Sequence, residues 1–372
     1  MEIGSVIELD DWCMYQLPEN SADSMKNFGL PFMGAEKPEY KNVFYQSGRN
    51  AIEVLLNFIQ KEFGVDAILI PDYVCGTVTD AVKRAGMEYS AYCINADLEV
   101  NVDEIKAQLD LGIKSIYVVH YFGIPVSQSL MDIISECRSK GIIVIEDITM
   151  ALLSSGDFTI GFGDYIVGSL RKWFAIPDGG IICSKCMPVP DEPSNNIVSR
   201  YTNLYMLVQA MKREYVSGNF KNKNLKENYL EYYSESIKEL FSDYRIYPMS
   251  EFSKRYIFNC NMDDIREKRI DNYNRLCDLV NGMNSFKVKS CSKDGAVPLG
   301  MWIECDNRDK LLQYLISCNI YCNVHWRLKE SVNNPDIKFL AYNVLTIPCD
   351  QRYGFYEMEY ISEKLKVWEE QQ

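Results

Sequence analysis

Alternation of short apolar segments with helical segments is the feature that most constrains how this chain can fold. Strand-like apolar segments occupy residues 67–71, 89–94, 115–120, 142–145, 165–170 and 180–183. Helical patterns over 76–85, 102–109 and 128–140 separate the first four of them. Strands that are apolar almost throughout are buried on both faces, so the pattern predicts an α/β fold with a mostly parallel sheet covered by helices. Ligands bind such sheets at the carboxyl ends of the strands.

The second half of the 372-residue chain predicts an added smaller unit. A Pro-rich shift at 188–193 precedes a Tyr-, Lys- and Glu-rich helical excursion over about 196–243, with a polar break at 218–224. Beyond it we expect helices at 262–279, 309–317 and 356–368, and strands at 300–304 and 321–326. We therefore expect a large domain over 1–249, which includes the excursion, and a smaller C-terminal α/β domain over 250–372.

Charge and histidine content exclude two classes of function. Acidic residues number 52 against 39 basic ones, a formal net charge of −13, which argues against nonspecific binding of nucleic acid. A local cluster of cations can still bind an anionic ligand. His120 and His325 are the only histidines, so a histidine-built metal centre is excluded and no metal is predicted.

Cysteine usage and the N-terminus favour a cytoplasmic protein. The thirteen cysteines are odd in number and scattered through apolar segments, which is typical of reduced, buried thiols. Cys183 and Cys186 form a lone CxxC pair without a second pair at zinc-ribbon spacing. Neither a signal peptide nor an apolar run of membrane-spanning length is visible, so no membrane partner is expected.

Two features at predicted strand ends and helix starts suit an anionic, nitrogen-containing ligand. The small-residue segment 47–52 (SGRNAI) opens a helix, where free backbone amides and the helix dipole bind phosphate, although Ser47 is also an ordinary N-cap. Asp147 directly follows the apolar strand IIVIE. An acid at that place faces a ligand or caps the next helix, and both interpretations stay open.

A lysine and an aromatic residue complete the set. Lys172 lies in GSLRKW (168–173), before the rigid turn PDGG, where a partly desolvated amine of lowered pKa can form a Schiff base. Tyr73 follows the strand AILIP and could stack on a planar ring. Pyridoxal 5'-phosphate requires this combination: a site for its phosphate, an aromatic side chain against its ring, an acid for its ring nitrogen and a lysine that forms the Schiff base.

The sequence also resembles the DegT/StrS-type, sugar aminotransferase-like branch of the fold-type I pyridoxal-phosphate enzymes. The lysine segment GSLRKWFAIPDGG and the segment VIEDITMALLSS are its specific matches. Further matching segments follow in the family's order: SGRNAI, IPDYVCGTV, HYFGIP, REKRIDNYNRL, NVHWRL and LTIPCDQRYG. The resemblance covers nearly the whole chain and implies the fold-type I architecture with a smaller C-terminal α/β domain.

Carried over position by position, the resemblance assigns roles to individual residues. Catalytic roles fall on Lys172, which would hold the cofactor as a Schiff base, and on Asp147, which would pair with the pyridinium nitrogen. The further residues placed near the cofactor are Ser47, the amides of Gly48 and Arg49, Tyr73, His120, Thr149 and Ser169. A core histidine is an equally good interpretation of His120. Those facing the substrate or closing the cleft are His325 and Trp326.

Two positions depart from the family pattern. Met150 stands where many members carry glutamine and others histidine, so the contact to the ring hydroxyl is in doubt unless Thr149 supplies it. Arg171 adds a cation beside Lys172, which suits an anionic substrate or only lowers the lysine pKa. These departures leave the cofactor chemistry intact and weaken the inference about the substrate.

The resemblance implies an aminotransferase. Its amino donor would be L-glutamate, its acceptor a nucleotide-linked keto-sugar of surface-polysaccharide or related biosynthesis, and its assembly a homodimer with shared active sites. The retained Lys172 argues against the dehydratase branch, which typically carries histidine there. Two alternatives stay open: an aminotransferase for a small carbonyl compound or amino acid, and a catalytically silent homologue.

Overall fold

The computed structural model describes residues 2–10, 28–156, 159–195, 197–218, 224–289, 294–326 and 334–372. Its largest sheet has seven strands in the order β2-β8-β7-β6-β5-β3-β4. Their bounds are β2 Lys41–Tyr45, β3 Ala67–Pro71, β4 Glu88–Tyr92, β5 Ser115–Val119, β6 Ile143–Asp147, β7 Tyr165–Ser169 and β8 Gly180–Ser184. The strands from β7 to β4 are parallel to one another, and β8 is antiparallel to both of its neighbours. The predicted α/β fold with a mostly parallel sheet is confirmed.

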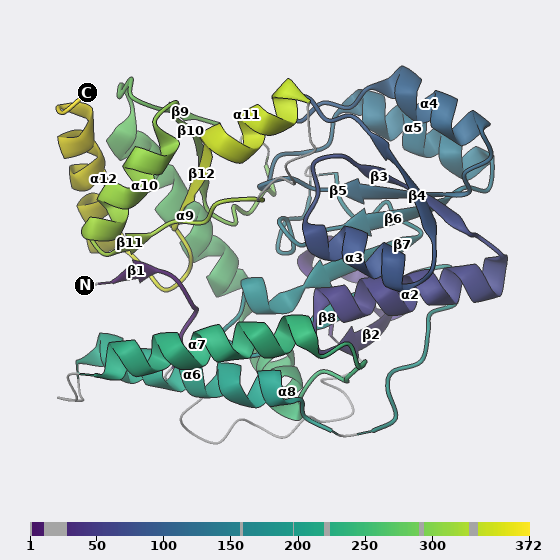
Figure 1. Ribbon diagram of the computed structural model, residues 1–372, viewed down its shortest axis with the longest axis horizontal. Coiled ribbons are helices and arrows are strands. Elements are labelled where there is room, and N and C mark those ends of the chain that lie inside the picture. The colour runs from purple at the N-terminus through teal and green to yellow at the C-terminus, as the bar shows by residue number, and fades with distance from the viewer. Residues whose placement is uncertain are drawn as a thin grey trace.

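Helices cover both faces of this sheet. Figure 1 shows α2 (Gly48–Phe63) and α3 (Gly76–Arg84) on one side, and α4 (Val102–Asp110) and α5 (Gln128–Ser139) on the other. α2 buries Ile52, Leu55, Leu56 and Ile59, which are spaced as one face of a helix. Because both faces are covered, every residue of β5, β6, β7 and β8 is buried.

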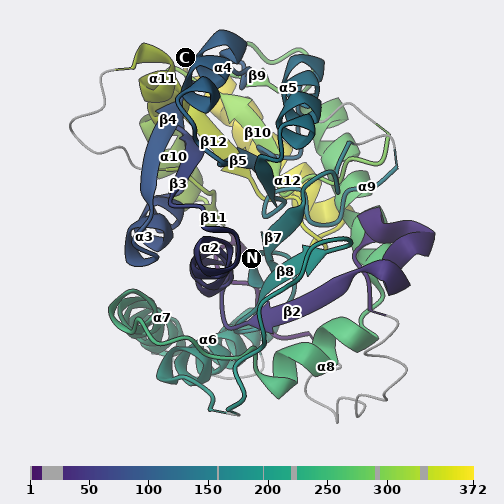
Figure 2. The ribbon, with the colours of Figure 1, turned by 90° about the vertical axis from the view of Figure 1, so that its right-hand side faces the viewer.

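The helical excursion is an antiparallel pair, α6 (Arg200–Ser217) and α7 (Leu225–Ser242), which lies beside α2 (Figures 1 and 2). Tyrosines dominate its core: Tyr201, Tyr205 and Tyr229 are buried with Val208 and Leu240. Most of the expected polar break at 218–224 lies outside the described residues. The pair therefore packs against the large sheet's helix layer and brings α7 to the edge where α2 begins.

The C-terminal part forms a second, smaller α/β unit. Its helices are α8 Glu251–Asn259, α9 Met262–Val280, α10 Arg308–Ser317, α11 Pro335–Asn343 and α12 Phe355–Glu369. Its short strands are β9 Lys287–Val288, β10 Met301–Glu304, β11 Ile320–Tyr321 and β12 Val344–Ile347. β12, β10 and β9 make an antiparallel sheet in that order, and β11 pairs in parallel with the N-terminal strand β1 (Ile3–Gly4).

Contacts cross the expected domain division at residue 250 in both directions. Ile3 lies in the core of the C-terminal unit, whereas Tyr256 and Ile257 of α8 pack with Trp173 beneath the large sheet. The division into 1–249 and 250–372 stays a proposal. Within it, β1 packs with the smaller unit and α8 packs with the larger one.

One predicted strand is largely wrong. The sequence predicts a strand over 321–326, but β11 ends at Tyr321. Asn323 makes an isolated bridge to Thr346, and the chain then leaves the sheet. The departing segment carries His325 and Trp326 toward the large sheet, as the contacts below show.

Candidate active site

A cavity of about 230 Å³ lies at the carboxyl edge of the large sheet. Its walls combine the start of α2, the segment after β3, the ends of β5, β6 and β7, one face of α7, and one residue of the C-terminal unit. The lining residues are Ser47, Gly48, Arg49, Ile52, Cys75, Thr77, Val78, Val119, Asp147, Thr149, Met150, Ser169, Arg171, Lys172, Ile237, Leu240, Phe241 and Trp326. Most of the predicted site residues therefore meet in one place, where such sheets bind ligands.

The start of α2 forms one wall. Ser47 is its N-cap and accepts a hydrogen bond at its Oγ from the Asn50 amide at 3.2 Å. The amides of Gly48 and Arg49, in the first turn, have no intrahelical acceptor. Ser169 at the end of β7 lies close by, since a Cβ at Gly48 would be 3.3 Å from the Ser169 Cβ. Helix amides and a hydroxyl thus converge as a cradle for an anion.

The side chain of Arg49 points toward the helical pair. Its Nη2 donates a hydrogen bond to the Leu240 carbonyl oxygen, and its guanidinium lies 5.4 Å from the centroid of the Phe241 ring. Arg49 therefore ties α2 to α7 with its side chain, and the role of its backbone amide in binding an anion stays a prediction.

Asp147 ends β6 on the cavity side of the sheet. Its Oδ1 accepts a hydrogen bond from the Thr149 amide at 2.8 Å, and its Oδ2 accepts one from the Tyr117 hydroxyl at 2.7 Å. Only 8% of Asp147 is exposed. A buried carboxylate with two donors keeps its remaining lone pairs for a cationic partner in the cavity.

His120 differs from the expectation that it contacts the cofactor. Successive residues of an extended chain face opposite sides of a sheet, and Val119, not His120, lines the cavity. His120 is buried and its Nε2 lies 2.7 Å from Oε1 of Glu146, which precedes Asp147 and points the other way. Glu146 also accepts hydrogen bonds from the amides of Gly161 and Gly163. The core interpretation of His120 therefore fits this structure.

Tyr73 also lies behind the cavity wall, in contrast to the expected ring-stacking position. Its hydroxyl donates to the His325 carbonyl oxygen at 3.0 Å, and its ring packs 4.9 Å from Trp326. Trp326 is the aromatic residue of that side that lines the cavity. Cys75, two residues beyond Tyr73, lines it as well, and sequence reasoning missed this residue although it lies in the matched segment IPDYVCGTV.

Lys172 ends the short 3-10 turn Leu170–Lys172 that follows β7. The turn is held in place because the Trp173 indole donates to the Thr149 carbonyl oxygen at 2.8 Å and the Gln351 amide donates to the Trp173 carbonyl oxygen at 2.7 Å. Burial lowers the pKa of the Lys172 amine, and Arg171 adds to this effect, whereas Asp147 opposes it. A lowered pKa favours the neutral amine, which is the nucleophilic form.

Arg171 and His325 flank this lysine. The Arg171 guanidinium lies 6.0 Å and 5.4 Å from the ring centroids of Tyr201 and Tyr205, so α6 holds it in place. His325 Nε2 lies 3.1 Å from the Thr346 hydroxyl. Burial and the charge of Lys172 lower the pKa of His325 to about 3, so its imidazole is neutral. Trp326 lines the cavity, and His325 stands beside it.

Sequence reasoning missed the contribution of α7. Ile237, Leu240 and Phe241 make an apolar wall opposite the sheet. Met150 adds a further apolar side chain to the lining, and Thr149 lines the cavity next to it. No local signal in the sequence of α7 indicates which helix it will face.

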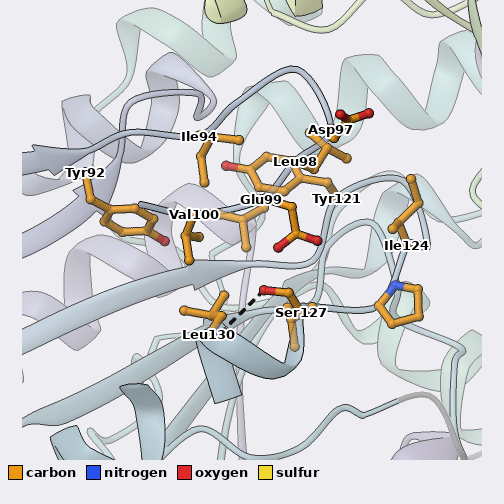
Figure 3. A pocket seen from close by; sticks show the side chains of 13 residues that line it. Tyr92, Ile94, Asp97, Leu98, Glu99, Val100, Tyr121, Ile124, Ser127 and Leu130 are labelled. Carbon is orange, nitrogen blue, oxygen red and sulfur yellow. Dashed lines mark hydrogen bonds between the residues drawn. The ribbon is translucent and has the colours of Figure 1, made fainter. Parts of the chain in front are cut away.

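A second, smaller hollow lies between the segments that follow β4 and β5. It borders Val119, which also lines the cavity described above. Figure 3 shows Glu99, Ser127 and Tyr121 among its walls. Its volume of about 40 Å³ suits water but not an organic ligand. The cavity lined by Asp147, Ser169 and Lys172 is the candidate active site, because the predicted site residues meet there.

Metal-binding and membrane-spanning features were also sought. Within the described ranges, no group of three or more His, Cys, Asp and Glu side chains could hold a metal ion. Cys183 is buried in the sheet, whereas Cys186 is exposed beyond its end. None of the helices in the described part of the chain is long and apolar enough to cross a membrane.

The order of the strands, the helices on both faces of the sheet and the smaller second unit define the class of fold. The chain has the fold of the fold-type I pyridoxal-phosphate-dependent transferases. PseC of Helicobacter pylori, an aminotransferase involved in pseudoaminic acid biosynthesis, matches over 100% of both chains, with a TM-score of 0.68 and 13% identity. The PMP form of the putative sugar aminotransferase Spr1654 of Streptococcus pneumoniae matches with a TM-score of 0.63 and 17% identity, over 89% of this chain and 86% of that one.

A DegT DnrJ EryC1 StrS aminotransferase of Brucella abortus matches with a TM-score of 0.59 and 15% identity, over 88% of this chain and 86% of that one. No sequence-family model and no curated protein sequence matches the chain. At these identities the likeness concerns the fold. The fold expected from the DegT/StrS resemblance is confirmed.

Proposed function

We propose that the protein is a pyridoxal-phosphate-dependent aminotransferase of the DegT/StrS type. It would move an amino group from an amino-acid donor, L-glutamate, to the keto group of a nucleotide-linked sugar in polysaccharide or related biosynthesis. The observation that carries the proposal is the meeting of Lys172, Asp147, Ser169 and the start of α2 around one cavity. Residues that are far apart in sequence thus supply the separate requirements of one cofactor.

The residues present fit this cofactor. The amides of Gly48 and Arg49 with the Ser169 hydroxyl would hold its phosphate, and Asp147 would pair with its ring nitrogen. Lys172 would bind its aldehyde carbon. When bound, the protonated ring withdraws electrons from the substrate carbon that loses a proton. Relatives of the same fold support this assignment, since Spr1654 has been solved in PLP and PMP forms.

The chain's own residues then divide the work. The amine of Lys172, once free, would carry the proton from the substrate carbon. Arg171, held by the tyrosines of α6, would keep that amine from being permanently charged. Neutral His325 and Trp326 would close the cavity from the C-terminal unit, and both are proposed to face the substrate.

Replacing Lys172 with Ala tests the proposal most directly. Purified protein incubated with pyridoxal phosphate is expected to absorb visible light, to lose that absorption when glutamate is added, and to carry the label on Lys172 after borohydride reduction. The Lys172→Ala variant should lose the absorption and at least about a hundredfold in turnover. Lys185→Ala, on the surface beside Glu36, is the matched control and should behave as wild type. A colourless wild-type protein would refute the proposal.

A panel of acceptors tests the substrate class. Nucleotide keto-sugars and small keto compounds would be offered with glutamate to the same preparation. We expect turnover of at least one nucleotide keto-sugar. Turnover of small compounds alone would reject the sugar assignment, and binding of the cofactor without any turnover would favour a catalytically silent homologue.

We also propose that the enzyme is a cytoplasmic homodimer with shared active sites. Phe241 supports the shared site, because it lines the cavity yet is 48% exposed, next to the exposed Tyr244. Leu207, Val216 and Leu230 add exposed apolar surface to the same helical pair. Light scattering is expected to give twice the 43.0 kDa chain mass, and a monomeric active enzyme would contradict this.

A further inference from the structure

Tyr117 contacts Asp147 although Tyr117 itself does not line the cavity. It lies in β5 opposite Ile145 of β6, two residues before Val119, so it faces the same side of the sheet as Val119 and Asp147. The side chain is fully buried. Its hydroxyl donates to Asp147 Oδ2 at 2.7 Å from beneath the cavity floor.

We propose that Tyr117 is a positioning residue for the proposed reaction, holding the Asp147 carboxylate in the orientation that faces the ring nitrogen of the cofactor. The inference rests on the proposed function. Tyr117 does not line the cavity and acts through Asp147 alone. It goes beyond the assigned site residues, which include Asp147 and Thr149 but not the donor to Asp147 Oδ2.

The two hydrogen bonds to Asp147 fix the direction in which its carboxylate points. Thr149 donates its amide to Oδ1 and Tyr117 donates its hydroxyl to Oδ2, so each oxygen has one protein donor and spare lone pairs. Loss of the Tyr117 donor would leave Oδ2 without its protein partner, so the carboxylate could turn away from the ring nitrogen and its pairing with the cofactor would weaken.

Tyr117 can act as a donor over the whole working pH range. Burial, followed by the charge of Asp147, raises the pKa of the Tyr117 hydroxyl far above its usual range. The other titratable groups that face the pair are Cys75, Tyr121 and Lys172. The strand is held as well, because the Tyr92 hydroxyl donates to the Tyr117 carbonyl oxygen at 3.0 Å. The Tyr117 hydroxyl therefore keeps its proton, and its strand is held in place beside Asp147.

Tyr117→Phe removes the hydroxyl and keeps the ring, and Tyr165→Phe is the matched control. Tyr165 is equally buried in β7, but its hydroxyl donates to the Pro188 carbonyl oxygen instead. For Tyr117→Phe we expect roughly tenfold weaker binding of pyridoxal phosphate, a roughly tenfold lower kcat with little change in KM, and a shifted pH midpoint of the bound cofactor's absorption. Tyr165→Phe should leave all three unchanged.

A double-variant cycle in ligand-free protein tests the contact without the cofactor. Urea midpoints would be compared for Tyr117→Phe, Asp147→Ala and the combined variant. We expect the combined shift to be smaller than the sum of the single shifts, because the two groups stabilise each other. Additive shifts would overturn the inference.

The outcomes separate the two proposals. If wild-type protein takes up no pyridoxal phosphate, the proposed function fails and the role of Tyr117 toward the cofactor fails with it. If wild type binds the cofactor and Tyr117→Phe binds it with the same affinity, spectrum and pH midpoint, only the inference about Tyr117 is refuted.

Discussion

At the scale of single residues, the environment of each titratable group decides its chemistry. Lys172 and His325 stand close enough for their charges to interact, and burial disfavours the charged form of each. The result is a neutral imidazole beside an amine of lowered pKa. Such a pairing suits a site in which one amine both bonds to a carbonyl carbon and transfers protons.

The pH dependence of folding should report the state of His325. Its pKa is about 3 in the folded chain and 6.5 in an unfolded one, so below pH 6.5 the unfolded chain binds a proton that the folded chain does not. The free energy of unfolding is therefore expected to fall as the pH drops from 6.5 toward 4, with a contribution of at most about 1.4 kcal/mol per pH unit. Urea unfolding of His325→Gln should show a shallower fall, and equal slopes would contradict the assignment.

At the scale of elements, the shape of the candidate active site depends on how closely α2 approaches β8. Gly179 donates its amide to the Gln46 carbonyl oxygen at 2.7 Å, and the next residue, Gly180, opens β8. A Cβ on Gly180 would lie 2.1 Å from the Ser47 carbonyl oxygen and 2.5 Å from the Gly48 nitrogen. The position of the anion cradle is thus set by a backbone contact that only glycine permits.

Gly180→Ala should separate the cradle from the sheet. We expect a loss of about 1–3 kcal/mol in the free energy of unfolding, as for other overpacked positions, and at least tenfold weaker binding of pyridoxal phosphate. Calorimetry and cofactor titration would measure the two effects. Gly76→Ala is the control, since a Cβ there meets no atom within 4 Å, and it should change the free energy of unfolding by less than about 1 kcal/mol.

At the scale of the whole molecule, a buried polar cluster joins three distant parts of the chain. Lys212 of α6 donates to the carbonyl oxygens of Gly4 and Val6 at 2.7 Å and 2.6 Å. Arg352, from the segment before α12, donates to Glu8 at 2.8 Å in the same cluster. The buried charges of Lys212 and Arg352 therefore hold the N-terminal segment, the helical pair and the C-terminal unit together.

Because of Lys212, the free energy of unfolding should increase with pH between about pH 8 and pH 10.5. Burial, with help from Arg352, lowers its pKa to about 8, against 10.5 for an unfolded lysine. Between these values the unfolded chain retains a proton that the folded chain has lost, so the free energy of unfolding should rise with pH, by up to about 3 kcal/mol. Lys212→Met should be less stable and lack this rise. An equal rise in the variant, measured by urea unfolding from pH 8 to 10, would refute it.

Local pattern was sufficient for much of the architecture. β3 spans the predicted 67–71, and the predicted helices at 102–109 and 128–140 end within one residue of α4 and α5. The prediction of a strand over 321–326 failed beyond Tyr321, because a local sequence pattern does not show whether a partner strand continues alongside. Neither β2 nor β12 was identified as a strand, and both pair with strands distant in sequence.

The sequence by itself determined the fold class and predicted most of the residues that line the candidate active site. Apolar periodicity indicates which face of an element is buried. Asp147 and Ser169 end parallel strands and Lys172 follows one, so all three lie at the same edge of the sheet. Only the tertiary structure decided which side chains reach the cavity. His120 and Tyr73 lie behind its wall, while α7 covers it and Tyr117 supports Asp147 from below. Those outcomes depend on contacts between segments far apart in the chain, and a local pattern specifies burial but not the partner.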